Sequence, residues 1–306
     1  MIVMANSSVT KLIDAIREDG TSGASELARQ ALKVFMIAGR ASRAKSTAVF
    51  LNEQHQIGQR LISTHPAMVS IHNVVNQLRR ILEENSSRLE ITAMKSLVIN
   101  KVNDMIKASL RDVARIRKYG MALISEGNTI LTYSFSSTVM ATLSEVLKTI
   151  KVLVLRSGAV QVDSRIRQQL ASNQILVSFV DFSLLNSFLP FVSKIIIGAD
   201  RICGDGSVIN AYGTNQLVRL ARKLDAPVYI MCETLKFDPW HRGHEILYED
   251  KVSPELIDLP GSLVTVIKKE PKYDITPIAM INGIVTERGI LAPDAVLQLM
   301  KDQSAL

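Results

Sequence analysis

Asp200 is the residue of this sequence with the most evident capacity for chemistry. It ends the apolar run "IIIGAD" (195–200) and is followed by "RICGDGSVINAYGTNQ" (201–216), which is rich in Gly, Asp and Asn. A turn does not require a carboxylate at that point, so we expect Asp200 either to act on a ligand or to accept backbone hydrogen bonds. Lys236 follows a later β-branched run, "PVYIMCE", and could supply a point charge to an anion.

Two expected helix N-termini could bind an anion, because free backbone N–H groups point outward there. The first begins at Ser136 and Ser137, after "TILTYSF", and taken alone is more typical of an ordinary serine cap. The second follows Gly213 and Thr214. Together with Asn210, these residues predict a pocket for a small phosphorylated or polyhydroxylated ligand, with a satisfied polar loop as the alternative.

The elements that must position these groups form two regions. From Val9 to about Glu126 apolar residues recur with a helical period, as in "GASELARQALKVFMIAGRA", which predicts the amphipathic helices of a bundle. From Asn128 short β-branched runs alternate with stretches of helix length, which predicts a parallel sheet covered on both faces. The expected fold is therefore α/β, with a helical N-terminal domain (1–126) and a doubly wound C-terminal domain (127–306). Such sheets bind ligands beyond the carboxyl ends of their strands.

The composition is that of a globular protein. The chain has 306 residues, 47% of them hydrophobic, which suffices for one large or two ordinary domains. No apolar run reaches the roughly 18 residues that span a bilayer, and "MIVM" lacks the apolar stretch of a signal peptide, so we expect a cytoplasmic protein without a membrane anchor. Cys203 and Cys232 can form neither a disulfide framework nor a four-ligand metal site, and are expected to be small buried residues.

The net charge of +7 is concentrated in the first part of the chain. Residues 1–120 hold 18 Lys and Arg against 10 Asp and Glu, and the remainder holds 18 against 19. A basic region could meet RNA or an acidic protein surface. The chain has no Arg-rich tract and no alternation of aromatic and basic residues, so we expect no direct nucleic-acid binding.

Several polar segments are expected to be irregular or structural. "HRGH" (241–244) has no third ligand nearby except Glu245, which favours an exposed loop over a zinc site. The segment 248–260 reads as a loop, and "KKEPK" (268–272) as a solvated connection or a contact for an acidic partner. Tyr273 and Asp274 of "KYDITP" are expected to make structural hydrogen bonds that secure a C-terminal strand. No metal and no cofactor are expected.

The stretch 195–237, "IIIGADRICGDGSVINAYGTNQLVRLARKLDAPVYIMCETLKF", resembles the signature of a known family. The segments "SGASELARQAL", "TILTYSFSSTV", "YDITP" and "GIVTERGILAP" agree with it, so that the resemblance covers nearly the whole chain. This family unites the alpha, beta and delta regulatory subunits of translation initiation factor 2B with ribose-1,5-bisphosphate isomerase and methylthioribose-1-phosphate isomerase. The resemblance implies a helical N-terminal domain, a Rossmann-like C-terminal domain and a dimer formed through the C-terminal domains.

The resemblance also implies which residues would catalyse an isomerisation. The isomerases of this family use a cysteine after the first strand and the aspartate of a G-A-D motif as an acid–base pair, and they grip phosphates with arginines and a lysine. This sequence keeps the aspartate as Asp200, together with Asn210 and Lys236. The cysteine position is occupied by Ser134, whose hydroxyl is a far weaker acid than a thiol.

Three further positions depart from the family pattern. The R-G-A motif reads Ser22, Gly23 and Ala24, so one arginine is missing. The E-[ST]-R-P motif reads "RSGA" (156–159), and the lysine of the N-K-x-G-T motif is Ala211. Four changes around one pocket are difficult to reconcile with the same isomerisation.

We therefore expect a non-catalytic regulatory subunit of the initiation factor 2B type, similar to an archaeal homologue, that keeps a pocket for a sugar phosphate or nucleotide. The expected ligand-binding residues are Gly23, Ala24, Ser136, Ser137, Asn210, Gly213, Thr214 and Lys236. The expected partners are a second copy of the chain and initiation factor 2 or related subunits. The alternative is an aldose–ketose isomerase of sugar phosphates in which Asp200 is the base and Ser134, or a group from elsewhere, is its partner. A third interpretation is a sugar isomerase with a different substrate.

Overall fold

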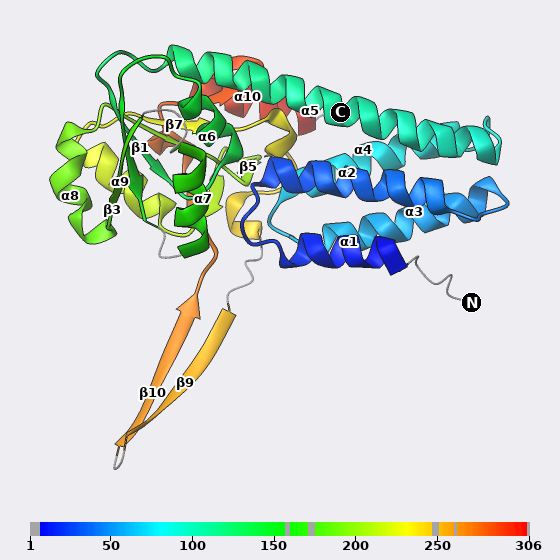
Figure 1. Ribbon diagram of the computed structural model, residues 1–306, viewed down its shortest axis with the longest axis horizontal. Coiled ribbons are helices and arrows are strands. Elements are labelled where there is room, and N and C mark those ends of the chain that lie inside the picture. The colour runs from blue at the N-terminus through cyan, green and yellow to red at the C-terminus, as the bar shows by residue number, and fades with distance from the viewer. Residues whose placement is uncertain (1–6, 157–159, 171–174, 247–250, 260–261, 305–306) are drawn as a thin grey trace.

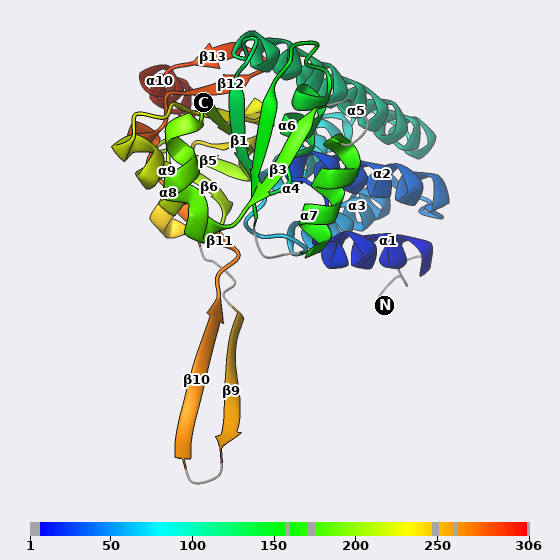
Figure 2. The ribbon, with the colours of Figure 1, turned by 60° about the vertical axis from the view of Figure 1, so that its left-hand side comes forward.

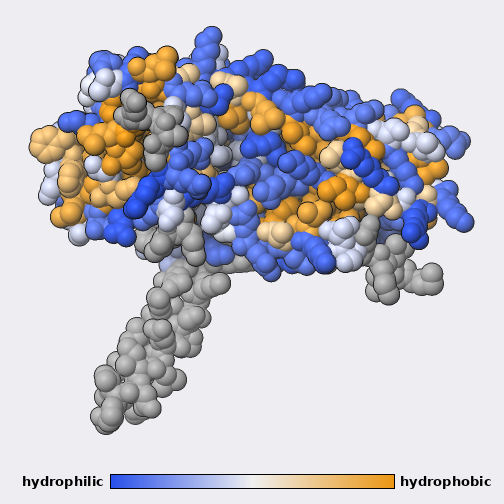
Figure 3. Space-filling model, in the orientation of Figure 1, coloured by the Kyte–Doolittle hydropathy of each residue, from blue (hydrophilic) through white to orange (hydrophobic). Residues whose placement is uncertain are grey.

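A helical bundle is joined to an α/β part in the computed structural model, which describes residues 7–156, 160–170, 175–246, 251–259 and 262–304 (Figure 1). The bundle helices are α1 (Ser7–Glu18), α2 (Ala24–Ala41), α3 (Thr47–Ile62), α4 (Val69–Asn85) and α5 (Ile91–Ala122). Their apolar faces enclose one core, which confirms the expected helical N-terminal region. On the face shown in Figure 3, the surface of this bundle mixes hydrophilic and hydrophobic side chains. None of the described helices combines the length and apolar character that crossing a membrane requires.

Helix α5 connects the two parts of the molecule. Its 32 residues form one continuous helix. Met94 and Val98 are buried in the bundle core, whereas Ile116 is buried in the core under the sheet. The same helix therefore contributes to both hydrophobic cores.

The α/β part is built on a seven-stranded sheet within the described residues. Its strands are β1 (Thr129–Tyr133), β2 (Lys151–Leu155), β3 (Leu176–Val180), β4 (Lys194–Ile197), β7 (Val228–Met231), β12 (Gly283–Thr286) and β13 (Gly289–Leu291). The order is β13-β12-β7-β4-β1-β2-β3, and every neighbouring pair is parallel except β12–β13. The expected doubly wound, Rossmann-like sheet is confirmed, with one antiparallel strand added by a tight hairpin. The chain order reverses direction between β1 and β4, which is where such sheets bind ligands.

Helices cover both faces of this sheet (Figure 2). They are α6 (Ser137–Ser144), α7 (Val160–Leu170), α8 (Leu185–Phe188), α9 (Thr214–Lys223) and α10 (Pro293–Ser304). Successive residues of a strand point to opposite faces. Ile130 of β1 accordingly packs in the core formed with α5, α6 and α7, and Leu131 packs in the core formed with α8, α9 and α10.

A smaller sheet and a long hairpin complete the described structure. The smaller sheet has the order β11 (Tyr273–Thr276), β6 (Val208–Ala211), β5 (Arg201–Cys203) and β8 (Phe237–Asp238). Strands β9 (Lys251–Leu259) and β10 (Ser262–Glu270) form an antiparallel hairpin that projects from the body in both ribbon views (Figures 1 and 2).

The hairpin corrects two expectations. Residues 251–259 and 268–270 were expected to be irregular, and they are strands; residues 248–250 and 260 lie outside the described part. Pro254 lies within β9, although proline removes a ladder hydrogen bond. It is accommodated opposite Ile267 in a two-stranded ribbon, where each strand has a free edge.

Candidate functional site

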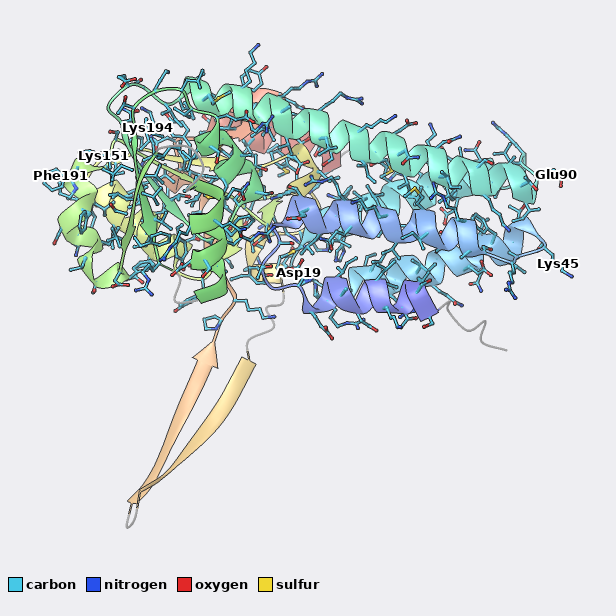
Figure 4. All side chains as sticks on the ribbon, in the orientation of Figure 1. Asp19, Lys45, Glu90, Lys151, Phe191 and Lys194 are labelled. Atoms are coloured by element: carbon cyan, nitrogen blue, oxygen red, sulfur yellow. The ribbon has the colours of Figure 1, made fainter. Side chains whose placement is uncertain are left out.

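A cavity of about 440 Å³ lies between the bundle and the sheet, at the reversal point of the strand order. Its wall comes from residues 19–24, His65, Met68, 133–137, Val162, 198–200, 210–212, Lys236 and 271–273. Strands β1 and β4 end in this wall, and the connection between α1 and α2 closes it from the other side. Asp19, labelled in Figure 4, marks the junction of the two parts.

The cavity collects most of the residues that the sequence singled out. The expected residues in its wall are Gly23, Ala24, Ser134, Ser136, Ser137, Asp200, Asn210 and Lys236. Gly213 and Thr214 do not line it. Residues widely separated in the chain thus form one concave surface. This agrees with the expectation that ligands bind beyond the carboxyl ends of the strands.

Asp200 lies directly after β4 and is half-buried. Its backbone N–H donates to the Ile209 carbonyl oxygen at 2.9 Å, which fixes the main chain at this point. Burial raises the pKa of Asp200 above its ordinary value of 3.8, and the positive charges of Lys236 and His65 only partly oppose this effect. The carboxyl group therefore keeps its proton to a higher pH than an exposed aspartate does.

Lys236 brings a buried positive charge to the same wall. It ends the short helix η4 (Thr234–Lys236), and its Nζ donates to the Ala199 carbonyl oxygen at 2.8 Å. That bond fixes the ammonium group beside the residue that precedes Asp200. An ammonium has three protons to donate, so this anchor leaves it able to bind an anion as well.

The turn between β1 and α6 presents a helix N-terminus to the cavity. Ser134 has a φ of 59°, in the left-handed region that non-glycine residues seldom occupy. Ser136 is the N-cap of α6, and its Oγ accepts from the Val139 N–H at a long 3.5 Å. A Cβ built on Gly198 would lie 2.7 Å from the Ser136 side chain, so the close approach of the two strand ends requires glycine at 198.

Gly23 keeps the end of α6 accessible. A Cβ at this position would lie 3.5 Å from Ser137 Oγ and 3.6 Å from the Ser137 N atom. Glycine therefore leaves room for a ligand atom next to that N–H, where the helix dipole favours negative charge.

The connection between α1 and α2 is shaped by Asp19. Its carboxylate accepts from the Thr21 N–H at 2.9 Å, the Thr21 hydroxyl at 3.0 Å and the Ser22 N–H at 2.8 Å. Burial alone would raise the pKa of Asp19, but the hydrogen bonds from Ser22 and Thr21 outweigh it and lower that pKa to about 2. A charged Asp19 thereby holds the main chain that leads to Gly23.

An arginine from α7 reaches the position where the family pattern has its own arginine. The Arg165 guanidinium donates to Ser22 Oγ at 3.2 Å and to Glu26 at 2.8 Å. It also lies 4.2 Å above the centre of the Phe135 ring. Ser22 and Phe135 both line the cavity, so Arg165 places a positive charge at its edge. No motif of the sequence pointed to this residue.

The N-terminus of α9 is not an open anion site, which corrects one expectation. The N–H groups of Gly213 and Asn215 donate to Asp274 at 2.8 and 3.0 Å. The Thr214 hydroxyl donates to the Ala211 carbonyl oxygen at 2.7 Å. Burial raises the pKa of Asp274, and the two backbone hydrogen bonds oppose that shift. A carboxylate from β11 therefore satisfies the helix end that the sequence had assigned to a phosphate.

Asp274 does make the structural hydrogen bonds expected of it, although they hold α9. Other wall residues were not expected, among them Asp19, His65, Met68, Tyr212 and Lys272. His65 Nε2 lies 2.7 Å from the Ile16 carbonyl oxygen, so this nitrogen carries the proton. The Tyr133 hydroxyl donates to the Tyr212 carbonyl oxygen, and burial raises the pKa of Tyr133 to about 12.

Arg156 is held away from the cavity wall. Its guanidinium pairs with Asp163 at 3.2 Å and with Asp181 at 3.1 Å. Residues 157–159, the rest of the altered motif, lie outside the described residues.

In "HRGH", His241 Nδ1 lies 3.0 Å from Asp238, and no described group of three His, Cys, Asp or Glu side chains could hold a metal ion. Both cysteines are buried and free.

Comparison with known proteins places this geometry in a family. Residues 20–293 match the model of the initiation factor 2 subunit family. The chain belongs to this family. It is 28% identical to the ribose 1,5-bisphosphate isomerase of Thermococcus kodakarensis, over 96% of this chain and 94% of that protein.

Solved structures of the initiation factor 2 subunit family share the fold. The translation initiation factor eIF-2B of Pyrococcus horikoshii OT3 matches with a TM-score of 0.80 and 22% identity, over 95% of this chain and 99% of that one. A chain of the tetrameric eIF2B-beta2-delta2 complex from C. thermophilum matches with a TM-score of 0.73 and 18% identity, over 97% and 94%. The resemblance read from the motifs is confirmed. The similarity to a named isomerase along nearly the full length supports the enzyme alternative better than a non-catalytic subunit.

Proposed function

We propose that this protein is an aldose–ketose isomerase of sugar phosphates, of the ribose 1,5-bisphosphate isomerase type. The observation that carries the proposal is the meeting of Asp200, Lys236 and the α6 N-terminus in one cavity at the reversal point of the sheet. The relative of that name, similar over nearly its full length, supports the same activity.

The proposed chemistry needs one group that can both give and take a proton. In ribose 1,5-bisphosphate the oxygen on carbon 1 carries a phosphate, so the bond between carbon 1 and the ring oxygen must break. Carbon 2 loses a proton, carbon 1 gains one, and the proton of the 2-hydroxyl goes to the former ring oxygen. The product is an isomer, so no oxidant or reductant is consumed. Asp200 suits this exchange because burial raises its pKa towards the working pH. Lys236 would stabilise negative charge that develops on the sugar oxygens.

The phosphate groups would bind at the positive edges of the cavity. The Ser137 N–H at the start of α6 offers a dipole and a donor. Lys236 and Lys272 offer ammonium groups in the wall. Arg165, at the edge beside Ser22, would replace the arginine that the R-G-A motif lacks, although it already pairs with Glu26.

The test is ketose formation from ribose 1,5-bisphosphate by the wild type, Asp200→Asn and a control. Asp104→Asn is the matched control, because Asp104 is an exposed aspartate on α5. The wild type and the control should convert the substrate, and Asp200→Asn should lose at least about a hundredfold in rate. Ser134→Cys should raise the rate, because a thiol is a much stronger acid than a hydroxyl. Full activity of Asp200→Asn would refute the assigned role.

A second candidate is a regulatory subunit that binds a sugar phosphate without converting it. Ser134 favours this candidate, because a serine stands where the resembled isomerases have their catalytic cysteine. Calorimetry that shows ribose 1,5-bisphosphate binding, together with no turnover by the wild type or Ser134→Cys, would select it over the isomerase.

Assembly is part of both candidates. We propose a homodimer through the C-terminal part, and for the regulatory candidate an association with initiation factor 2 or related subunits. A related chain occurs in a beta2-delta2 tetramer, which supports association between chains of this fold. A mass measured in solution tests whether the chain forms a dimer. A pull-down with purified initiation factor 2 at micromolar concentration tests the association with that factor.

A further inference from the structure

His65 shares with Asp200 the wall of the cavity between the bundle and the sheet, the sugar-phosphate cavity. It lies in the connection between α3 and α4 and is half-buried. A positive charge on the His65 imidazole lowers the pKa of Asp200, so the two side chains are near enough for their charges to interact. His65 is the only histidine in the described part of this wall. Because an imidazole gives and takes a proton near neutral pH, a second proton carrier is available beside Asp200.

Hydrogen bonds to three other elements hold the His65 ring and its main chain. Nε2 donates to the Ile16 carbonyl oxygen of α1 at 2.7 Å. The His65 carbonyl oxygen accepts from the Met68 N–H, at the start of α4, at 3.0 Å. The next residue, Pro66, accepts from the Arg201 guanidinium of β5 at 3.1 Å. The ring is therefore fixed from the bundle and from the α/β part together.

The second ring nitrogen, Nδ1, is left for a substrate. It has no hydrogen-bond partner among the described residues, and it is not one of the buried polar atoms that lack a partner, so solvent reaches it. The Ile16 carbonyl holds the proton of Nε2 whether or not Nδ1 is protonated. Nδ1 can therefore gain or lose a proton without a change in the orientation of the ring.

Other acidic side chains of the wall are poor partners for Asp200. Burial alone would raise the pKa of Asp19, but hydrogen bonds from the α1–α2 connection lower it to about 2, so its carboxylate stays charged. Burial raises the pKa of Tyr133 to about 12, and the Tyr133 hydroxyl already donates to a backbone carbonyl. The Ser134 hydroxyl belongs to a side-chain type that is a very weak acid. An imidazole is better suited than any of these to move a proton at neutral pH.

We propose that His65 is the second proton carrier of the isomerisation, the group that protonates the ring oxygen of the sugar and then removes the proton of its 2-hydroxyl. This role rests on the proposed isomerase function, in which Asp200 carries the proton from carbon 2 to carbon 1. His65 thereby supplies the partner that Ser134 cannot be.

The two side chains together balance the reaction. First, the Asp200 carboxylate removes the proton of carbon 2, and that electron pair forms a double bond between carbons 1 and 2. The bond from carbon 1 to the ring oxygen breaks, and the ring oxygen takes the proton of His65 Nδ1. Next, Nδ1 takes the 2-hydroxyl proton as the carbonyl forms at carbon 2, and the double-bond pair takes the proton of Asp200 onto carbon 1. Both side chains return to their starting charge.

The test compares the wild type, His65→Gln and a control in the full chain. Glutamine removes the proton carrier and keeps an N–H donor for the Ile16 carbonyl. His55→Gln is the matched control, because His55 is an exposed histidine on α3 outside this cavity wall. Turnover of ribose 1,5-bisphosphate gives kcat, and calorimetry gives its Kd. The wild type and the control should agree, and His65→Gln should lose at least about a hundredfold in kcat while Kd changes by less than about tenfold.

His65→Ala adds a measurement that a change in cavity shape alone would not move. Imidazole in the buffer should raise its rate at least about tenfold, because it can carry the proton from the vacated space. Pyrazole, a ring of the same size but a far weaker base, should not raise it. The role of His65 is refuted if His65→Gln keeps more than about a tenth of the wild-type kcat, or if imidazole and pyrazole have the same effect. A wild type without turnover would refute the isomerase function itself, whereas an active wild type with an equally active His65→Gln would refute the role of His65 alone.

Discussion

Arg201→Met tests whether a buried ion pair holds the sugar-phosphate cavity together. Arg201 follows Asp200 directly, and its Nη1 lies 3.0 Å from Asp238 Oδ2, with the two side chains 5% and 2% exposed. Its Nη2 donates to the Pro66 carbonyl oxygen at 3.1 Å. Pro66 in turn follows His65, so the guanidinium connects the two sides of the cavity wall.

The size of the effect follows from what the substitution leaves behind. Methionine keeps much of the arginine's apolar volume and removes two hydrogen bonds that involve a charged group, each of about 1.5–3 kcal/mol. Asp238 then remains buried, and among the described residues it keeps the Trp240 N–H and His241 Nδ1 as hydrogen-bond partners. Removing one partner of a buried ion pair costs about 3–5 kcal/mol, and we expect Arg201→Met to lower the free energy of unfolding by that amount. The double variant Arg201→Met with Asp238→Leu should lose much less than the sum of the two single changes, because no unpaired charge stays buried.

Urea unfolding followed by circular dichroism measures all of these differences. Arg222→Met is the matched control, since Arg222 is exposed on α9, and it should change the free energy of unfolding by less than about 0.5 kcal/mol. Arg201→Met should also weaken the binding of ribose 1,5-bisphosphate, since it loosens His65 against Asp200. A loss below about 1 kcal/mol for Arg201→Met, or a double variant as unstable as the sum of the singles, would refute the reasoning.

Three further outcomes are expected. Gly198→Ala should lower the free energy of unfolding, measured in urea, by about 1–3 kcal/mol and weaken ligand binding, because its Cβ would meet the Ser136 side chain at 2.7 Å. An unchanged free energy of unfolding and unchanged binding would show that the N-terminus of α6 moves aside without cost. Because burial raises the pKa of Asp200 in the folded state, the native protein holds this proton more tightly than the unfolded chain, so stability should fall as the pH rises from 3.8 through the raised pKa. Urea titrations over that range should show a smaller decline for Asp200→Asn, and identical pH profiles would contradict the assignment. Cys203 and Cys232, whose thiol pKa burial raises to about 12, should resist iodoacetamide at about pH 8 until the protein is unfolded, as mass spectrometry can determine.

The sequence predicted those parts of the site that depend on strand ends. Asp200 and Ser136 follow β-branched runs, and parallel strands bring their carboxyl ends to one edge, so their convergence could be expected without coordinates. Asp274 shows the limit of this reasoning. Whether a helix end is open to a ligand depends on which distant side chain caps it, and no local pattern linked Asp274 to Gly213.

The wall residues from the bundle could not be predicted for a related reason. His65 and Asp19 reach the cavity because two independently packed cores meet there, and helical periodicity reports only which face of each helix is buried. Arg165 likewise approaches Ser22 from a helix more than a hundred residues away in sequence. The missing arginine of the R-G-A motif could be read from the sequence, but the contact of Arg165 with Ser22 required the three-dimensional arrangement.

Helix α5 constrains how a ligand can enter the cavity. Val98 is anchored in one core and Ile116 in the other, and about 27 Å of unbroken helix separates them. A hinge motion between the bundle and the sheet would have to bend or break this helix. We therefore expect the two parts to move as one rigid body and not to open and close against each other. Admission and release of a ligand then depend on the short wall segments 19–23 and 271–273, which contribute no residue to either core.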